Sequence, residues 1–178
     1  MTENEADNFD NIEHVNETWG TDKKGNGVEI SNNKRTLRQT VSTTNSSGNT
    51  TCRGSTLMDQ NRIYKFKVKV DTRGYGYVAV GIVLASSGMG EAKTISWSFD
   101  CYGSTKKISP NTGWVSYGTN VNAGDTITVI VDKSAGTLEF EVNDISQGVA
   151  FNNLPNEEFV FFTELSGNTG CQVSLCDF

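Results

Sequence analysis

Residues 124–151 read GDTITVIVDKSAGTLEFEVNDISQGVAF, and this stretch decides the fold. Apolar and polar residues alternate along 126–132 and again along 137–142, which is typical of strands with one buried face. The expected buried residues are Ile127, Val129, Val131, Leu138, Phe140 and Val142. The pair Asn143-Asp144 fits a two-residue hairpin turn, because both residue types tolerate positive φ. These residues therefore predict an antiparallel meander that ends in a third strand over 145–151.

The same period extends to both sides of this stretch. Further strands are expected, with the loops between them rich in small and polar residues. The expected strands cover 62–70, 75–84, 94–102, 159–165 and 171–178, with loops over 43–51, 84–93 and 103–112. The chain has 18 Gly and only 2 Pro, which favours tight turns between strands. No second domain or repeat is visible. We expect a flexible acidic arm over 1–10 and a single all-β sandwich domain over 11–178.

The charge distribution argues against a nucleic acid partner, and the lack of a long apolar run argues against a membrane-spanning helix. The net charge of −6 is carried entirely by residues 1–30. Residues 34–73 are basic, but Lys65, Lys67 and Lys69 alternate with apolar residues, as on the solvated face of a strand. No apolar run approaches the 18 residues of a membrane-spanning helix. The N-terminus has neither the basic start nor the apolar stretch of a secretory signal.

The residues offer little to an enzyme, metal or cofactor. The four cysteines, at 52, 101, 171 and 176, have no CxxC spacing, so reduced and mostly buried thiols are expected rather than a zinc site. His14 is the only histidine, so a catalytic triad or a His-based metal site would have to include it. The pair Glu139 and Glu141 has a spacing seen in some sandwich glycosidases, but both fall on the face opposite Phe140, where solvent is the default partner. We expect a non-catalytic protein without cofactor.

The chain resembles the SPRY domain family in the order of its short motifs. The last third carries the most specific of them, in the family pattern "GD", "D-x-x-x-GTL-x-F" and "N-x-x-x-GVAF-x-x-L". Here these are Gly124-Asp125, Asp132, Gly136-Thr137-Leu138, Phe140, Asn143, Gly148-Val149-Ala150-Phe151 and Leu154. Upstream, the matching segments are Arg53-Gly54-Ser55, Tyr64-Lys65-Phe66-Lys67-Val68, Val80-Gly81-Ile82, Ser96-Trp97-Ser98-Phe99 and Tyr117-Gly118.

The resemblance implies a bent sandwich of two antiparallel sheets, of concanavalin or jelly-roll type, with no enzymatic activity. It also implies that loops at one edge form a shallow cleft for a short peptide or a protein surface. Family members often choose substrates for ubiquitin ligases or serve as adaptors in other complexes. The chain departs from the SOCS-box subgroup, because Leu165-Ser166-Gly167-Asn168 lacks that subgroup's tryptophan. The peptide specificity of that subgroup is therefore not expected here.

Binding surfaces on such a scaffold depend on aromatic and Arg anchors in loops. The candidate partner-binding residues of the loop cleft are Arg53, Tyr102, Trp114, Tyr117, Ser166 and Asn168. Each has a structural alternative: Arg53 could tie two strands together, while Trp114 and Tyr117 could pack as core. Trp19 and Trp97 are assigned to the core.

A protein or peptide is thus the expected partner of a monomeric protein in the cytoplasm or nucleus. The alternative is a carbohydrate-binding, lectin-like sandwich. Its galectin-type strand motifs are missing, and the segment Asn120–Asp125 is the sole weak candidate for a calcium loop.

Overall fold

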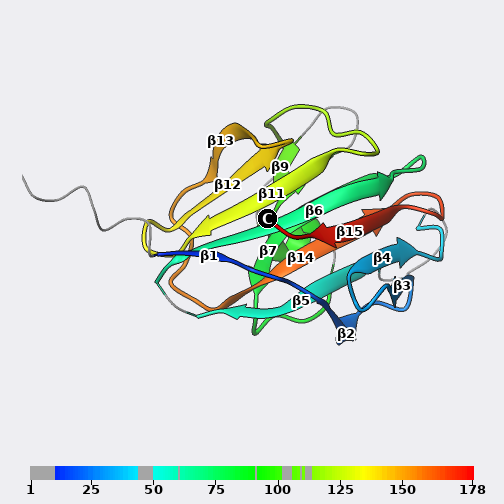
Figure 1. Cartoon of the computed structure of the whole chain (residues 1–178), viewed down its shortest axis with the longest axis horizontal. Coiled ribbons are helices and arrows are strands. Elements are labelled where there is room, and N and C mark those ends of the chain that lie inside the picture. Colours follow the sequence, from blue (N-terminus) through cyan, green and yellow to red (C-terminus); the bar gives the residue numbers. More distant parts are fainter. Residues whose placement is uncertain are drawn as a thin grey trace, which may run out of the picture.

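The predicted all-β sandwich is confirmed by the structure, a computed structural model in which two sheets pack face to face (Figure 1). It describes residues 11–43, 50–59, 61–90, 92–101, 106–108, 110 and 114–178. The expected acidic arm over 1–10 lies outside the described residues. No helix in the described ranges is long and apolar enough to cross a membrane.

The first sheet, here the β6 sheet, is built around the longest strand. Its order is β13 (Ile145–Phe151), β12 (Thr137–Val142), β11 (Thr126–Asp132), β6 (Ile63–Thr72), β15 (Gln172–Cys176), β4 (Thr36–Gln39) and β3 (Val28–Ser31). Neighbours along this order are antiparallel. The short strand β1 (Ile12–His14) runs parallel to β6, in the same sheet.

The second sheet, here the β7 sheet, is antiparallel throughout. Its order is β10 (Val115–Ser116), β9 (Lys106–Ile108), β8 (Ser96–Asp100), β7 (Tyr77–Leu84), β14 (Phe159–Ser166), β5 (Thr51–Met58) and β2 (Trp19–Lys24). A single helical turn, α1 (Ala92–Ile95), precedes β8. Three expectations were wrong: β9 lies within the predicted loop 103–112, Thr94 and Ile95 belong to α1 rather than to the predicted strand 94–102, and Tyr75 precedes β7 and is 87% exposed.

Aromatic rings fill the space between the sheets. The ring of Phe66 in β6 stacks on Phe161 in β14 with centroids 5.4 Å apart. The indole of Trp19 also packs on Phe161, with centroids 5.4 Å apart. Farther along the core, Phe99 in β8 meets Phe140 in β12 at 5.4 Å. All five side chains are fully buried, as the period-two pattern predicts for the inward face of each strand.

The deciding stretch folds as its pattern predicts. β11 pairs with β12 from Ile127↔Val142 to Asp132↔Thr137, so all six predicted residues face the core. Asn143 and Asp144 have φ of 50° and 62°, as a two-residue type I′ hairpin turn requires. Asp132 accepts hydrogen bonds from Ser134 Oγ at 2.6 Å and Ala135 N at 2.8 Å, within its own turn.

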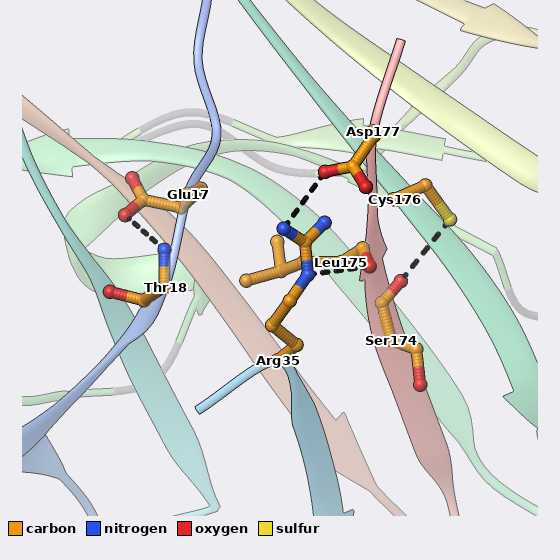
Figure 2. Close-up of polar contacts among 7 residues, drawn as sticks. All are labelled: Glu17, Thr18, Arg35, Ser174, Leu175, Cys176 and Asp177. Atoms are coloured by element: carbon orange, nitrogen blue, oxygen red, sulfur yellow. Dashed lines mark hydrogen bonds and ion pairs between the residues drawn. The ribbon is translucent and has the colours of Figure 1, made fainter. Parts of the chain in front are cut away.

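The hairpin between β3 and β4 joins both ends of the chain to the core. Its residues Asn32, Asn33 and Lys34 all have positive φ. The carbonyl of Lys34 accepts from Trp19 N at 2.8 Å, and that of Arg35 accepts from Trp19 Nε1 at 3.1 Å. Figure 2 shows the Arg35 side chain reaching the C-terminal strand, where Nε donates to Leu175 O at 3.4 Å and Nη1 pairs with Asp177 at 2.9 Å.

Replacing Lys34 with glycine should stabilise the protein. A side chain in the left-handed region costs about 1–2 kcal/mol, whereas glycine adopts it freely but loses about 0.5–1 kcal/mol more entropy on folding. We expect the free energy of unfolding to rise by about 0.5 kcal/mol in urea titrations. The same change at the exposed strand residue Lys23 should lower it. A loss of stability in Lys34→Gly would contradict the assignment of strain to this turn.

Gly81 in β7 has no room for a side chain. A Cβ there would lie 2.0 Å from the backbone oxygen of Trp97 in the adjacent strand. We expect Gly81→Ala to lower the free energy of unfolding by about 3 kcal/mol or to prevent folding, because backbone cannot yield as a flexible side chain does. The control is Gly88→Ala, where no atom lies within 4 Å of the added carbon. Equal melting temperatures for the two variants would contradict this.

Candidate functional site

The outer face of the β7 sheet, turned away from the core, carries an unusual number of buried polar side chains. Register places Glu164 of β14 beside Ala79 of β7, and Ala79 beside Asp100 of β8. Both acids are only 5% exposed. Charged residues are rarely buried to this extent without a structural or functional reason. The other buried residues of this face are Thr51, Arg53, Ser96, Ser98, Val83, Val160 and Phe162.

A cluster of Tyr77, Glu164 and Trp114 occupies the end of this face where β7 begins and β14 ends. The hydroxyl of Tyr77 donates to Glu164 Oε1 at 2.7 Å. Burial, together with the charge of Glu164, raises the pKa of Tyr77, so this hydroxyl stays protonated and continues to donate. The indole of Trp114 meets the Tyr77 ring edge-on with centroids 6.5 Å apart, while 43% of Trp114 remains exposed. The exposed indole of Trp114 therefore rests on Tyr77, whose position is set by its hydrogen bond to Glu164.

The loop after β14 is held against this cluster by hydrogen bonds. Ser166 lies opposite Tyr77 in the β7–β14 register, and its Oγ bonds Thr43 Oγ1 at 3.0 Å. Gly167 N donates to the same Thr43 hydroxyl at 2.6 Å, and Gln39 Nε2 donates to Gly167 O at 3.1 Å. Gly76 allows the approach, because a Cβ there would lie 1.5 Å from Ser166 O. The backbone of this loop is therefore fixed before any partner arrives.

Three of the six predicted site residues come together at this end of the sheet. Trp114 and Ser166 both adjoin Tyr77, and Asn168 is exposed in the loop that Ser166 begins. Tyr117 packs inward instead, edge-on to Phe99 at 5.6 Å, with its hydroxyl on Gly148 O at 2.5 Å. Tyr102 lies outside the described residues. A role in partner binding stays a prediction for each of them.

Arg53 lies in β5 rather than in a loop, opposite Phe162 and 5% exposed. Its Nη2 donates to Ser87 Oγ at 3.2 Å and to the Gly88 carbonyl, so it ties β5 to the loop after β7. Desolvation by burial lowers the pKa of Arg53. The guanidinium therefore sits beneath the loop Ser86–Gly90, at the other end of the outer face from Trp114.

The carboxylate of Glu17, 2% exposed, fixes the backbone on which Arg53 sits. It accepts from Ser55 N at 2.8 Å, Ser55 Oγ at 2.8 Å and Thr56 N at 3.2 Å. Figure 2 shows it also receiving the amide of Thr18, at 2.8 Å. Gly54 leaves the space that this carboxylate fills, since a Cβ would lie 2.4 Å from Glu17 Oε2. The Arg53-Gly54 pair thus has a steric explanation.

The sequence did not single out Tyr77 or Glu164. The signal for Glu164 was present, because it is the one charged residue in the largely apolar run 159–165. A lone charge in a central strand indicates a buried polar partner on the same face. Tyr77 gave no comparable signal, since tyrosine is common in strands.

The remaining ionisable groups of the described residues include the acid of the calcium candidate and the four cysteines. Asp125, in the weak calcium candidate, accepts from Asn122 N at 2.7 Å and Asn143 Nδ2 at 2.9 Å, and these bonds lower its pKa. Within the described ranges, no group of three His, Cys, Asp or Glu side chains is placed to hold a metal ion. The four thiols are free, and burial raises the pKa of Cys52 to about 12, which keeps it protonated.

Comparison with known proteins identifies the fold and the family. The model of the SPRY domain matches residues 63–178. The crystal structure of the SPRY domain of human HERC1 is similar, with a TM-score of 0.71 at 20% identity, over 90% of this chain and 98% of that one. The TRIM65 PSpry domain gives a TM-score of 0.72 at 13% identity, over 95% and 92%. No curated protein matches by sequence. At these identities the structural likeness establishes the fold alone.

Tyr77→Phe tests the buried cluster. Loss of the hydroxyl removes a donor from a buried carboxylate, which typically costs about 1–3 kcal/mol. We expect the free energy of unfolding to fall by about 2 kcal/mol and Trp114 fluorescence to change. Tyr75→Phe is the matched control, because Tyr75 is 87% exposed, and it should change neither. Equal stability of the two variants would show that the Tyr77–Glu164 bond contributes nothing.

Proposed function

The chain belongs to the SPRY family, and we propose that it binds a short peptide or a surface loop of a partner protein. The proposal starts from the family, whose domains are generally non-catalytic protein-interaction modules. The site is the end of the outer face that carries Trp114, Tyr77, Ser166 and Asn168. The chain acts there as an adaptor or substrate-recognition module. We place it in the cytoplasm or nucleus as a monomer that uses no cofactor.

The observation that carries this proposal is the state of Trp114. Tryptophan buries more area per side chain than other residues and loses little rotamer entropy on binding, so it is enriched among interface anchors. The ring of Tyr77 packs edge-on against the indole of Trp114, and Tyr77 is itself held by its hydrogen bond to Glu164. The indole is therefore held in place while 43% of it remains exposed.

The neighbouring loop supplies the polar part of the surface. Thr43 and Gln39 hold the backbone of Gly167, and Thr43 also bonds the hydroxyl of Ser166. A backbone that is ordered before binding loses less conformational entropy on complex formation. The exposed Asn168 lies in this loop and offers both a donor and an acceptor to a peptide backbone. An aromatic anchor beside a fixed polar loop is the usual composition of a peptide-binding surface.

Trp114→Ala tests the site in a pull-down from source-cell lysate, analysed by mass spectrometry. We expect bound partners to fall about tenfold or more, because truncating an anchor typically costs over 1–2 kcal/mol of binding. The matched control is Ile145→Ala. Ile145 is 68% exposed but lies in β13, an edge strand of the other sheet.

Thermal melts should first show that both variants fold. Free sugars are added in a parallel lane, where they should not displace the partners. Partners that survive Trp114→Ala, or that sugars release, would refute the proposed site and favour another face or a lectin-like function.

A further inference from the structure

Arg53 is a buried cation for which the described residues supply no counter-ion. Its side chain is 5% exposed, and no carboxylate in the described part of the chain forms an ion pair with it. Its Nε is buried and has no hydrogen-bond acceptor. Burying a guanidinium and leaving a donor unpaired are both costly, so such groups are rare in folded proteins. The cost disappears when an anion reaches the group.

The hydrogen bonds that Arg53 does make leave one edge of the guanidinium half filled. Nε–H and one Nη2–H point in the same direction and together match the two oxygens of a carboxylate. In the free protein the Gly88 carbonyl and Ser87 Oγ accept from Nη2, while Nε has no acceptor. Nη2 therefore already has acceptors within the protein, one of which an oxygen of a bidentate carboxylate would have to replace. A second oxygen would satisfy Nε.

We propose that Arg53 is the receptor for a carboxylate of the partner, which replaces the Gly88 carbonyl when it binds. The proposal rests on the proposed function in one respect, that the partner is a protein or peptide. The carboxylate is an Asp or Glu side chain or the C-terminus of the partner. Both bonds are charge-assisted, but the one that forms joins two ions, whereas the one it replaces joins a cation to a neutral carbonyl.

Within the described part of the chain, access to Arg53 requires the movement of one loop, Ser86–Gly90. Among the described residues, the loop Ser86–Gly90 covers the Gly88 end of the guanidinium, and Gly88 and Met89 in this loop are exposed. Nothing lies within 4 Å of the position of a Gly88 Cβ, so no packed side chain holds this residue down. The contacts that a carboxylate must displace are the two made by Arg53 Nη2. The backbone beneath is fixed by Glu17 and does not have to move.

The carboxylate receptor and the aromatic anchor are within reach of one peptide. Arg53 pairs with Phe162, and Ser166 lies four residues farther along β14. Four residues of extended strand span about 13 Å. A peptide of five or six residues would therefore bring a carboxylate to Arg53 while an apolar side chain contacts Trp114.

The test uses synthetic peptides on the full chain. An array of random twelve-residue peptides, each made with a free and with an amidated C-terminus, is probed with the wild-type protein. The strongest binder and its Glu→Gln, Asp→Asn or amidated isostere are then titrated against wild type and Arg53→Gln by fluorescence polarisation. We expect loss of the carboxylate to weaken binding to wild type by about 10- to 100-fold and to leave binding to Arg53→Gln unchanged. The amidated arm distinguishes a C-terminal carboxylate from a side chain.

A second measurement does not depend on the stability of the variant. In wild type, the NMR signal of Arg53 Nε–H should shift on addition of the acidic peptide, as an acceptor reaches it, and not on addition of the neutral isostere. Arg53→Lys, which retains the charge, assigns the signal.

Binders that require no carboxylate, or an isostere penalty that is the same on Arg53→Gln, would overturn the proposal. So would an Nε–H signal that does not respond to the acidic peptide. The same peptides are also titrated against Trp114→Ala. If binders that need no carboxylate lose affinity for this variant, the proposed function stands without the carboxylate receptor. If no peptide depends on Trp114, the proposed function fails as well.

Discussion

The contact between Phe66 and Phe161, closed on one side by Trp19, is the interaction on which the rest of the structure depends. It joins the two sheets at their centre, and the indole can take this position only if its N–H is satisfied. The carbonyl of Arg35 accepts that N–H and also the amide of Leu175. The β3–β4 hairpin therefore holds the N-terminal strand, the C-terminal strand and the aromatic core together. Its run of positive φ values is the local cost of this arrangement.

Outside this core, buried charged side chains lie on the outer face of the β7 sheet. The outer face of the β6 sheet carries Lys65, Lys67 and Lys69 on β6 and the acids Glu139 and Glu141 on β12, with β11 between the two strands. Lys67 also pairs with Asp144 at 2.7 Å. This outer face is an ordinary solvated face. The outer face of the β7 sheet instead buries Arg53, Asp100 and Glu164. Polar groups at this depth give directional, charge-dependent recognition, which an apolar face cannot provide.

The fold could be predicted because it depends on local patterns. Alternation of side chains located β11, β12 and most of β6, and the Asn143-Asp144 turn followed from the backbone preferences of those two residues. β9 was missed because a three-residue strand is too short for a period to appear. Tyr75 was placed in β7 because its neighbours are apolar, but the backbone turns at Gly74, which has φ of 59°.

By itself, the sequence determined the sandwich and which residues face its core, because a period of two and the turn chemistry of Gly, Asn and Asp act between near neighbours. It also indicated Trp114, Ser166 and Asn168 as surface candidates. Only the tertiary structure decided that Tyr77 and Glu164 bond each other, that Tyr117 packs inward, and that Arg53 is buried and bonds the Gly88 carbonyl. Those relations join residues between 31 and 87 positions apart. The physical reason is that strand order and register, which no local pattern encodes, determine which side chains meet across a sheet.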